Sequence, residues 1–251
     1  MTAHKTETAG DGARDVTFAP IARILSAPRD RPFVVAQLGQ SLDGRIAIES
    51  GESRWINGHA ALVHVHRVRA AVDAVVVGVG TVAADDPLLN VRHVAGRNPA
   101  RVVIDPNGRL PPSARCLNGE DGCRRIVVRA TAGPLPKGVE ELHLQETNGR
   151  LCPASIVDGL FRLGLKSMLI EGGAHTVSSF LAARALDRLH VLVAPVILGS
   201  GKPGLQLPPI ARLADALRPP TDVHVLDDGD VLFDCDLRAC QEGSIAHGNA
   251  P

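Results

Sequence analysis

A polar segment in the first half of the chain has the side chains needed to bind a phosphorylated polyol. Asp85 and Asp86 are adjacent acids, and Arg92 follows seven residues after the first of them. Carboxylates accept hydrogen bonds from hydroxyl groups, whereas a guanidinium pairs with a phosphate. The sequence Asp-Asp-Pro is also common where a helix ends, so a purely structural role remains open for these acids.

A second candidate site lies at Glu171-Gly172-Gly173, between a predicted buried strand at Ser167–Ile170 and a predicted helix over 174–186. The glycines allow the backbone to approach a ligand closely, and the helix start offers free N–H groups to an anion. The carboxylate of Glu171 would weaken a pure phosphate site, so we expect it to address a hydroxyl or a base edge. An ordinary strand–helix turn explains the glycines equally well.

Hydrophobic patterning predicts an α/β domain around these segments. Strands alternate with helices and a hairpin ends the chain, so we expect one mixed, mostly parallel sheet with helices on both faces and a C-terminal antiparallel hairpin. Pro195 inside one strand suggests an edge position or a bulge. The predicted helices are a short docking helix within Val16–Ser26, then 59–72 and 153–163; the predicted strands are Phe33–Leu38, Asp73–Gly78, Arg101–Asp105, Ile126–Arg129, Glu141–Leu144, His190–Leu198 and the hairpin Asp222–Leu237.

Residues 78–83 match the dinucleotide fingerprint G-x-G-x-x-A, and the next strand ends in the acid Asp105. Pro87 stops the intervening helix after about two turns. A Rossmann helix must be long enough to cross back over its sheet, so we reject that fold.

Composition narrows the class of protein. The 251 residues carry no formal net charge, only 2% aromatic residues and no Tyr, which argues against nucleic-acid binding. No apolar run reaches membrane-spanning length and no signal-peptide core is visible, so we expect a cytoplasmic protein that does not bind membranes.

The five cysteines have irregular spacing, as expected of reduced thiols. His64 and His66 lie two residues apart, outside the apolar face formed by Ala61, Leu62, Val65, Val68 and Val72, and no metal site is expected.

We expect residues 1–31 to form an N-terminal extension whose first 15 or so residues are disordered. Residues 32–240 are predicted to form a single domain, and residues 241–251 a frayed tail.

Several motifs occur in a fixed order between about residues 33 and 204. Together they resemble the reductase domain of the riboflavin-pathway deaminase/reductase family, which shares the dihydrofolate reductase fold. The deaminase patterns H-x-E and P-C-x-x-C are absent, so the resemblance implies reductase activity alone. The motifs are SLDGRIA (41–47), ESRWI (52–56), HRVRAAVDAVVVGVGTVAADDPLLNVR (66–92), RVVIDPNGRLP (101–111), LIEGG (169–173) and APVILGSG (194–201).

The resemblance implies a homodimeric enzyme that uses NADPH on a small sugar-phosphate substrate. It would reduce the ribose of a 5-amino- or 2,5-diamino-6-ribosylaminopyrimidinone 5′-phosphate to a ribityl chain. The opened sugar presents an aldehyde or imine carbon that accepts hydride.

The resemblance also assigns roles to individual positions. It implies a cis peptide bond between Gly172 and Gly173, and an Arg109 that favours NADPH over NADH. The implied catalytic residues are Asp85 and Glu171; the substrate-binding residues are Ser53, Arg69, Asp86, Leu89 and Arg92; and the cofactor-binding residues are Trp55, Asn57, Gly80, Thr81, Asn107, Arg109, Gly172, Gly173 and Gly199.

Two positions depart from the family pattern. Gln37 stands where bifunctional members usually have Lys, and Asn57 stands where Thr is usual. Loss of a cation is compatible with a less anionic substrate. A reductase of the same fold that acts on a pterin or another carbonyl compound therefore stays as an alternative. A non-catalytic NADPH-binding protein is a third, because the sequence shows no activated nucleophile or metal centre, although hydride transfer needs neither.

Overall fold

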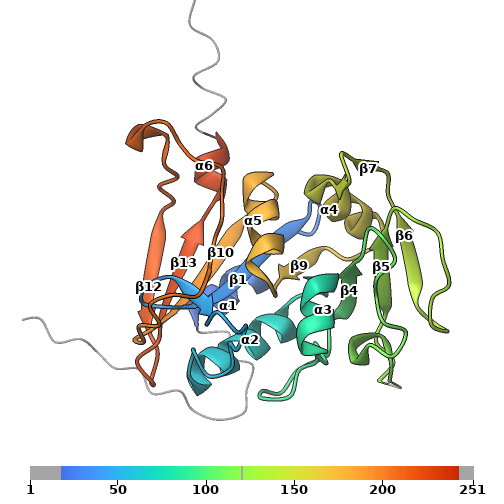
Figure 1. Ribbon diagram of the computed structural model, residues 1–251, viewed down its shortest axis with the longest axis horizontal. Coiled ribbons are helices and arrows are strands. Elements are labelled where there is room, and N and C mark those ends of the chain that lie inside the picture. Colours follow the sequence, from blue (N-terminus) through green and yellow to red (C-terminus); the bar gives the residue numbers. More distant parts are fainter. Residues whose placement is uncertain (1–17, 120, 243–251) are drawn as a thin grey trace, which may run out of the picture.

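A central sheet organises the part of the chain that the computed structural model describes, residues 18–119 and 121–242 (Figure 1). Within these residues nine strands form that sheet. The predicted disordered start and all but the first two residues of the predicted tail lie outside the described residues. In spatial order the strands are β12 (Thr221–Val225), β13 (Val231–Asp236), β10 (Arg188–Ala194), β1 (Phe33–Ser41), β9 (Ser167–Ile170), β3 (Ala74–Gly78), β4 (Ala100–Ile104), β5 (Arg125–Arg129) and β6 (Glu140–His143).

Strand direction confirms the predicted fold class. All neighbours from β10 to β6 are parallel, whereas β13 pairs antiparallel with both β10 and β12, so the chain ends in the predicted hairpin. Two short antiparallel pairs lie outside the main sheet. They are β2 (Arg45–Ala47) with β11 (Lys202–Pro203), and β7 (Glu146–Thr147) with β8 (Arg150–Leu151).

Helices cover both faces because the buried side chains of each strand alternate between them. On one face Ala36 and Ile170 share a core with helix residues Val177 and Phe180; on the other, Val35 packs in a core with residues of α1 and α2. The predicted docking helix is confirmed as α1. The helices are α1 (Ala19–Leu25), α2 (His59–Ala71), α3 (Val79–Asp85), α4 (Pro153–Arg162), α5 (Ala174–Ala182) and α6 (Arg238–Glu242), with 3-10 turns at Arg115–Leu117 and Leu213–Asp215.

The short helix α3 confirms the argument against a Rossmann fold. It ends at Asp85, and Asp86 adopts the left-handed conformation with φ 39°. Pro87 follows directly, so the helix cannot continue. None of the helices in the described ranges is both long enough and apolar enough to cross a membrane.

Two predictions of local structure were wrong. Strand β10 stops at Ala194 and lies between β1 and β13, so Pro195 marks neither an edge strand nor a bulge but the end of the ladder, where no N–H is needed. His64 and His66 are buried, while Leu62 and Val65 are half-buried. A polar partner decides the orientation of His64, because its Nε2 lies 3.2 Å from Nδ1 of His190.

Candidate active site

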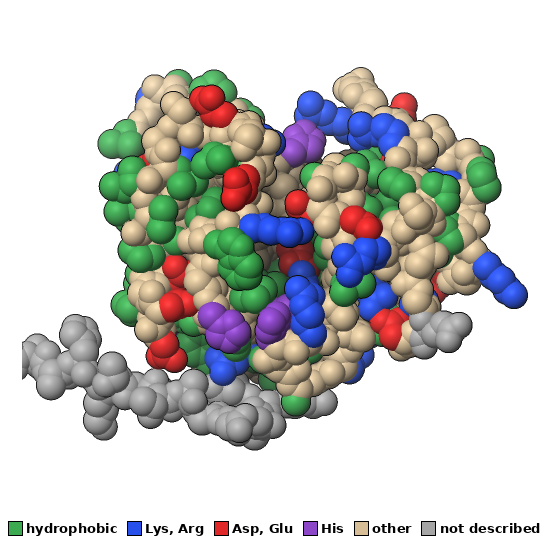
Figure 2. All heavy atoms as spheres, turned by 60° about the horizontal axis from the view of Figure 1, so that its bottom comes forward, with side chains coloured by type: hydrophobic (Ala, Val, Ile, Leu, Met, Phe, Trp, Pro, Cys, Tyr) green, Lys and Arg blue, Asp and Glu red, His purple; other side chains and the backbone are tan. Residues whose placement is uncertain are grey.

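A cleft of about 730 Å³ opens at the carboxyl ends of the parallel strands. In Figure 2 it is a hollow between two parts of the surface, with acidic and basic side chains next to each other on its walls. Loops and helix starts meet at this edge of a parallel sheet, which is where such sheets bind ligands.

The structure brings the two polar segments of the sequence together in this cleft. Asp85, at the end of α3, and the turn Glu171-Gly172-Gly173, after β9, both line it. The predicted site residues that line the cleft are Ser53, Asn57, Gly80, Thr81, Asp85, Asn107, Arg109, Glu171, Gly172 and Gly173.

The paired glycines form a tight turn against α3. Gly172 has φ 102°, and a Cβ added there would lie 2.6 Å from Oγ1 of Thr81. The N–H of Gly173 donates to the same Oγ1 at 2.9 Å. The predicted cis bond between the glycines is wrong, because the described residues contain no cis peptide bond. The left-handed Gly172 lets the chain reverse with every bond trans.

Glu171 forms a buried ion pair with Arg69 of α2. Nε of Arg69 donates to Oε1 at 2.8 Å, and Nη2 donates to Oε2 at 3.0 Å. The remaining Nη1 donates to the carbonyl oxygen of Asn90 at 3.0 Å. The guanidinium implied as a phosphate ligand is thus engaged in orienting a carboxylate through two parallel hydrogen bonds.

His66 holds the backbone of Arg92. Its Nδ1 accepts the Arg92 N–H at 3.2 Å, and Nη1 of Arg92 donates to Oδ1 of Asn90 at 2.9 Å. Burial, helped by Arg69, Arg92 and His93, lowers the pKa of His66 to about 3, so the ring is neutral and Nδ1 is free to accept. Arg92 is exposed and lies outside the cleft lining.

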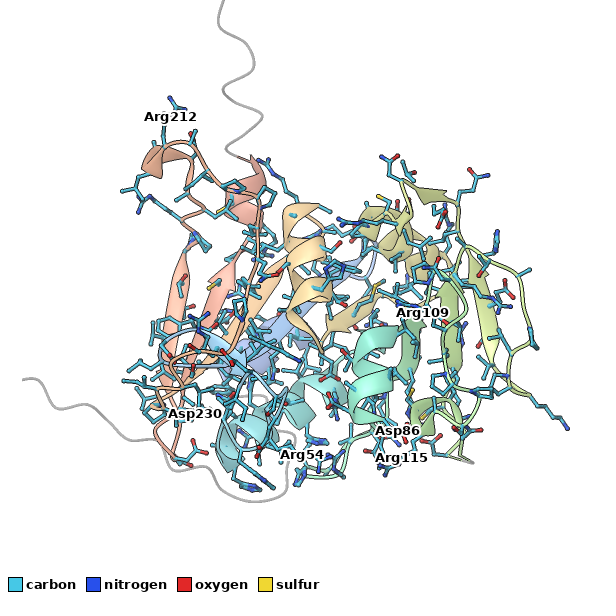
Figure 3. All side chains as sticks on the ribbon, viewed as in Figure 1. Arg54, Asp86, Arg109, Arg115, Arg212 and Asp230 are labelled. Carbon is cyan, nitrogen blue, oxygen red and sulfur yellow. The ribbon has the colours of Figure 1, made fainter. Side chains whose placement is uncertain are left out.

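Four other predicted site residues do not line the cleft. Oδ1 of Asp86 accepts the backbone N–H of Arg115 at 2.8 Å, and the two residues lie next to each other below α3 in Figure 3. Leu89 is 2% exposed and belongs to the core under α2. Trp55 is 86% exposed with φ 72°. Gly199 lies in the loop after β10.

Asp43 joins two of the sequence motifs, SLDG and GSG, through hydrogen bonds. Its carboxylate accepts the hydroxyl of Ser41 at 2.6 Å and the N–H groups of Leu198 and Gly199 at 3.1 and 2.8 Å. The bond from Ser41, then those from the backbone, lower the pKa of Asp43 to about 2. These bonds tie the loop after β1 to the loop after β10, which continues into β11 and brings Lys202 to the cleft.

Asp105 shapes the loop after β4 in a similar way. It is 1% exposed and accepts the N–H groups of Arg109 and Leu110 at 2.9 and 2.8 Å. The loop folds back over its own strand, and Asn107 and Arg109 therefore line the cleft.

The turn of the C-terminal hairpin holds the start of α2. Oδ2 of Asp230 accepts from Nδ2 of Asn57 at 3.2 Å and from the N–H of Gly58 at 2.9 Å, and Oδ2 of Asp228 accepts the N–H of Ala60 at 2.7 Å. Asp230 lies at the left of Figure 3, beside the sheet end that carries β12. These acids supply the cap that the helix lacks locally, at its positive end.

Sequence reasoning missed several residues of the cleft. Gln37 was noted only as a departure, while Arg150, His175, Ser179 and Lys202 were not considered. Lys202 reaches the cleft through the long-range pairing of β11 with β2, whereas Arg150 lies in the local hairpin β7–β8, which the turn Asn148-Gly149 could have signalled. The spacing of His175 and Ser179, on the first turns of α5, was the one local signal available.

Comparison with known proteins gives consistent matches. The RibD C-terminal domain family matches residues 32–225. The chain is 35% identical over 199 residues to the 2,5-diamino-6-ribosylamino-4(3H)-pyrimidinone 5′-phosphate reductase of Methanothermobacter thermautotrophicus, with 75% of this chain and 90% of that protein covered. It is 34% identical over 178 residues to the riboflavin biosynthesis protein RibD of Aquifex aeolicus, with 69% of this chain covered. The chain spans about half the length of that second relative, 49%.

Solved structures agree with these matches. A deaminase/reductase of Thermotoga maritima superposes with a TM-score of 0.70 at 30% identity, over 82% of this chain and 57% of that one. The riboflavin biosynthesis reductase Rib7 of Saccharomyces cerevisiae gives a TM-score of 0.69 over 88% of this chain and 99% of that one, and its 19% identity shows a shared fold. Cleft, fold and family match lead to one conclusion: the chain belongs to the RibD C-terminal domain family.

Proposed function

We propose that the chain reduces the ribose of a 5-amino- or 2,5-diamino-6-ribosylaminopyrimidinone 5′-phosphate to the ribityl form, using NADPH. One observation carries the proposal: the glycine turn before α5 and the acid at the end of α3 face one cleft. Relatives named as pyrimidinone 5′-phosphate reductases support this choice of substrate.

The residues present fit a dinucleotide on one wall. The turn at Gly172 has no room for a side chain, and the N-terminus of α5 offers backbone N–H groups to a pyrophosphate. Arg109 and Arg150 both line the same cleft and supply the positive charge that a 2′-phosphate needs. NADPH, when bound, supplies the hydride.

The substrate wall must hold the sugar and manage a proton. Asp85 is exposed to the cleft, where its carboxylate is available to accept hydrogen bonds from sugar hydroxyls and to exchange a proton with them. Arg69 fixes the plane of the Glu171 carboxylate, so this second acid meets the substrate in one orientation. Ser53 and Lys202 also line the cleft and are suited to the 5′-phosphate.

The test follows NADPH oxidation by the purified chain with each pyrimidine intermediate. We expect turnover with one or both, and an Asp85→Asn variant that binds substrate but loses about a hundredfold in kcat. If NADPH is oxidised with neither intermediate, the proposal is wrong. A dihydropterin in the same assay tests the alternative that Gln37 keeps open, a reductase of another carbonyl compound.

Cofactor preference has its own test. Arg109→Met and Arg150→Met are each expected to lower the ratio of kcat/KM for NADPH over NADH by about tenfold, because each removes a charge-assisted contact. Arg212→Met is the matched control, since Arg212 is an exposed residue far from Arg109 in Figure 3. An unchanged ratio in both cleft variants would remove these arginines from cofactor selection.

We also propose a homodimer in the cytoplasm. Among residues 18–119 and 121–242, β12 is an edge strand with no partner on its outer side, and Val223 and Val225 on it are 56% and 74% exposed. Light scattering of the purified chain decides the oligomeric state, and Val225→Lys is expected to shift a dimer toward monomer. A monomeric wild type would contradict this part of the proposal.

A further inference from the structure

Gln37 carries a polar atom in the cleft that has no hydrogen-bond partner among the residues that the structure describes. The residue is only 7% exposed, and its carboxamide Oε1 is buried without a hydrogen bond. Gln37 nevertheless lines the cleft from the middle of β1. A buried acceptor left unpaired destabilises the folded protein, so its retention points to a ligand that supplies the missing donor.

Its neighbours on the sheet are already engaged. Gln37 is in register with His190 on β10, and Ala36 is in register with Ile170, which places Gln37 beside Glu171. Glu171 is paired with Arg69, and Nδ1 of His190 is paired with His64.

The side chain faces the substrate half of the cleft. Residues two apart on a strand share a face. Val35 and Leu169 pack in the core beneath α2, so Gln37 and Glu171 point to that same face. The α5 N-terminus, proposed to bind the pyrophosphate, belongs to the helix that covers the opposite face.

We propose that Oε1 of Gln37 accepts a hydrogen bond from a neutral N–H or O–H group of the substrate and thereby selects substrates that carry such a donor. An acceptor beside the Glu171 carboxylate disfavours an anionic ligand group at this point, which places the phosphate elsewhere. This inference rests on the proposed function, because it assigns one contact of that substrate.

The experiment combines stability and kinetics of Gln37→Met, which keeps the length of the side chain and removes the acceptor. The melting temperature of the ligand-free variant is expected to rise by about 2–4 °C, because the unpaired oxygen is gone. The KM for the pyrimidine substrate is expected to rise about tenfold, with the KM for NADPH unchanged. Gln40→Met, on the same strand but outside the cleft lining, is the matched control and should change neither KM.

A fall in the melting temperature of both Gln37→Met and Gln37→Ala would show a structural role for Gln37 and overturn the inference. An unchanged substrate KM in a variant that still turns over would overturn it as well, while leaving the proposed reductase activity intact. If the wild type reduces neither pyrimidine, the proposed function fails first. In that case the melting temperature of Gln37→Met alone tests the inference: a rise relative to wild type supports a ligand contact at Oε1, and a fall excludes it.

Ribose 5-phosphate separates the two sources of the donor. It carries the sugar hydroxyls without the pyrimidine amino groups. If ribose 5-phosphate inhibits Gln37→Met about tenfold more weakly than it inhibits wild type, the contact is assigned to a sugar hydroxyl. Equal inhibition together with a raised substrate KM assigns it to an amino group of the pyrimidine.

Discussion

The two walls of the cleft are built in different ways. The proposed cofactor wall uses local turns: Asp105 caps the loop that follows its own strand, and Gly172 turns the chain directly into α5. The proposed substrate wall depends on distant partners, as in Arg69 with Glu171, which are 102 residues apart. Local turns can be recognised as motifs, whereas the other wall exists only once the chain is folded.

The largest expected effect comes from removing Arg69. Arg69→Met leaves the Glu171 carboxylate buried without its cation, so we expect a loss of about 3 kcal/mol in the free energy of unfolding and at least about a hundredfold in kcat/KM. Urea unfolding and steady-state kinetics measure the two losses.

Arg69→Met with Glu171→Gln is the control for that prediction, since the double variant leaves no unpaired charge and should regain most of the stability. If the single variant is as stable as wild type, the ion pair does not hold the substrate wall together.

A change of pH tests the segment beside that wall whose backbone His66 holds at Arg92. Its folded pKa of about 3 lies below the ordinary value of 6.5, so the unfolded chain takes up a proton first as the pH falls. The free energy of unfolding should therefore drop by about 2 kcal/mol from this residue between pH 7 and pH 5. The buried His64, whose pKa burial also lowers, contributes in the same direction.

His66→Asn keeps an acceptor for the Arg92 N–H but cannot titrate in this range. Its urea-unfolding free energy should depend less steeply on pH between 7 and 5 than that of wild type. The carboxylates whose pKa values are lowered, such as Asp43 and Asp234, lose their contribution only at lower pH. Equal slopes for the two proteins would remove His66 as a source of the pH dependence.

On the cofactor wall the matching test is Thr81→Val. The N–H of Gly173 then loses its acceptor and the glycine turn loses its link to α3. We expect NADPH to bind about tenfold more weakly, measured by fluorescence titration. Thr81→Ser retains the hydroxyl and should bind nearly as well as wild type. Undiminished binding by the valine variant would mean that the turn is rigid without α3.

The smallest effect is expected at Asp86, which sequence similarity places in the substrate site and the structure places outside the cleft. Asp86→Asn retains an acceptor oxygen for the N–H of Arg115, so kcat/KM should change by less than about threefold. The same assay on Asp85→Asn gives the contrast. If Asp86→Asn lowers kcat/KM as much as Asp85→Asn does, Asp86 belongs to the substrate site.

The sequence was sufficient to predict the sheet, because Val-rich strands and Gly- or Pro-rich turns are local signals. It was also sufficient to predict that α3 is short, since Pro87 determines where the helix ends. It failed where a residue's surroundings come from elsewhere in the chain. His64 looked like a surface residue until His190 was placed opposite it, and the strand through Pro195 looked continuous because the preceding residues are apolar.

The same physics limited prediction of the site. Asp85, Thr81 and the glycine pair are the residues of two continuous motifs, and the cleft contains all of them. Lys202 enters it through a pairing of β11 with β2 that no local pattern specifies, whereas the hairpin that carries Arg150 has a local signal, Asn148-Gly149, that was overlooked. Arg69 was assigned to a phosphate through the family resemblance alone, and an isolated arginine on a helix gives no sign of the carboxylate that it meets.

The hairpin turn that caps α2 also has a consequence for the order of assembly. The acceptors at Asp228 and Asp230 lie 168 and 172 residues after the N–H groups they satisfy. During synthesis, the first turn of α2, the helix that carries Arg69 and His66, therefore lacks these acceptors until nearly the whole polypeptide has been made. A chain that ends before this hairpin turn lacks the acceptors for the first turn of α2, so shortening the protein from its C-terminal end is expected to disturb a helix formed by residues 59–71.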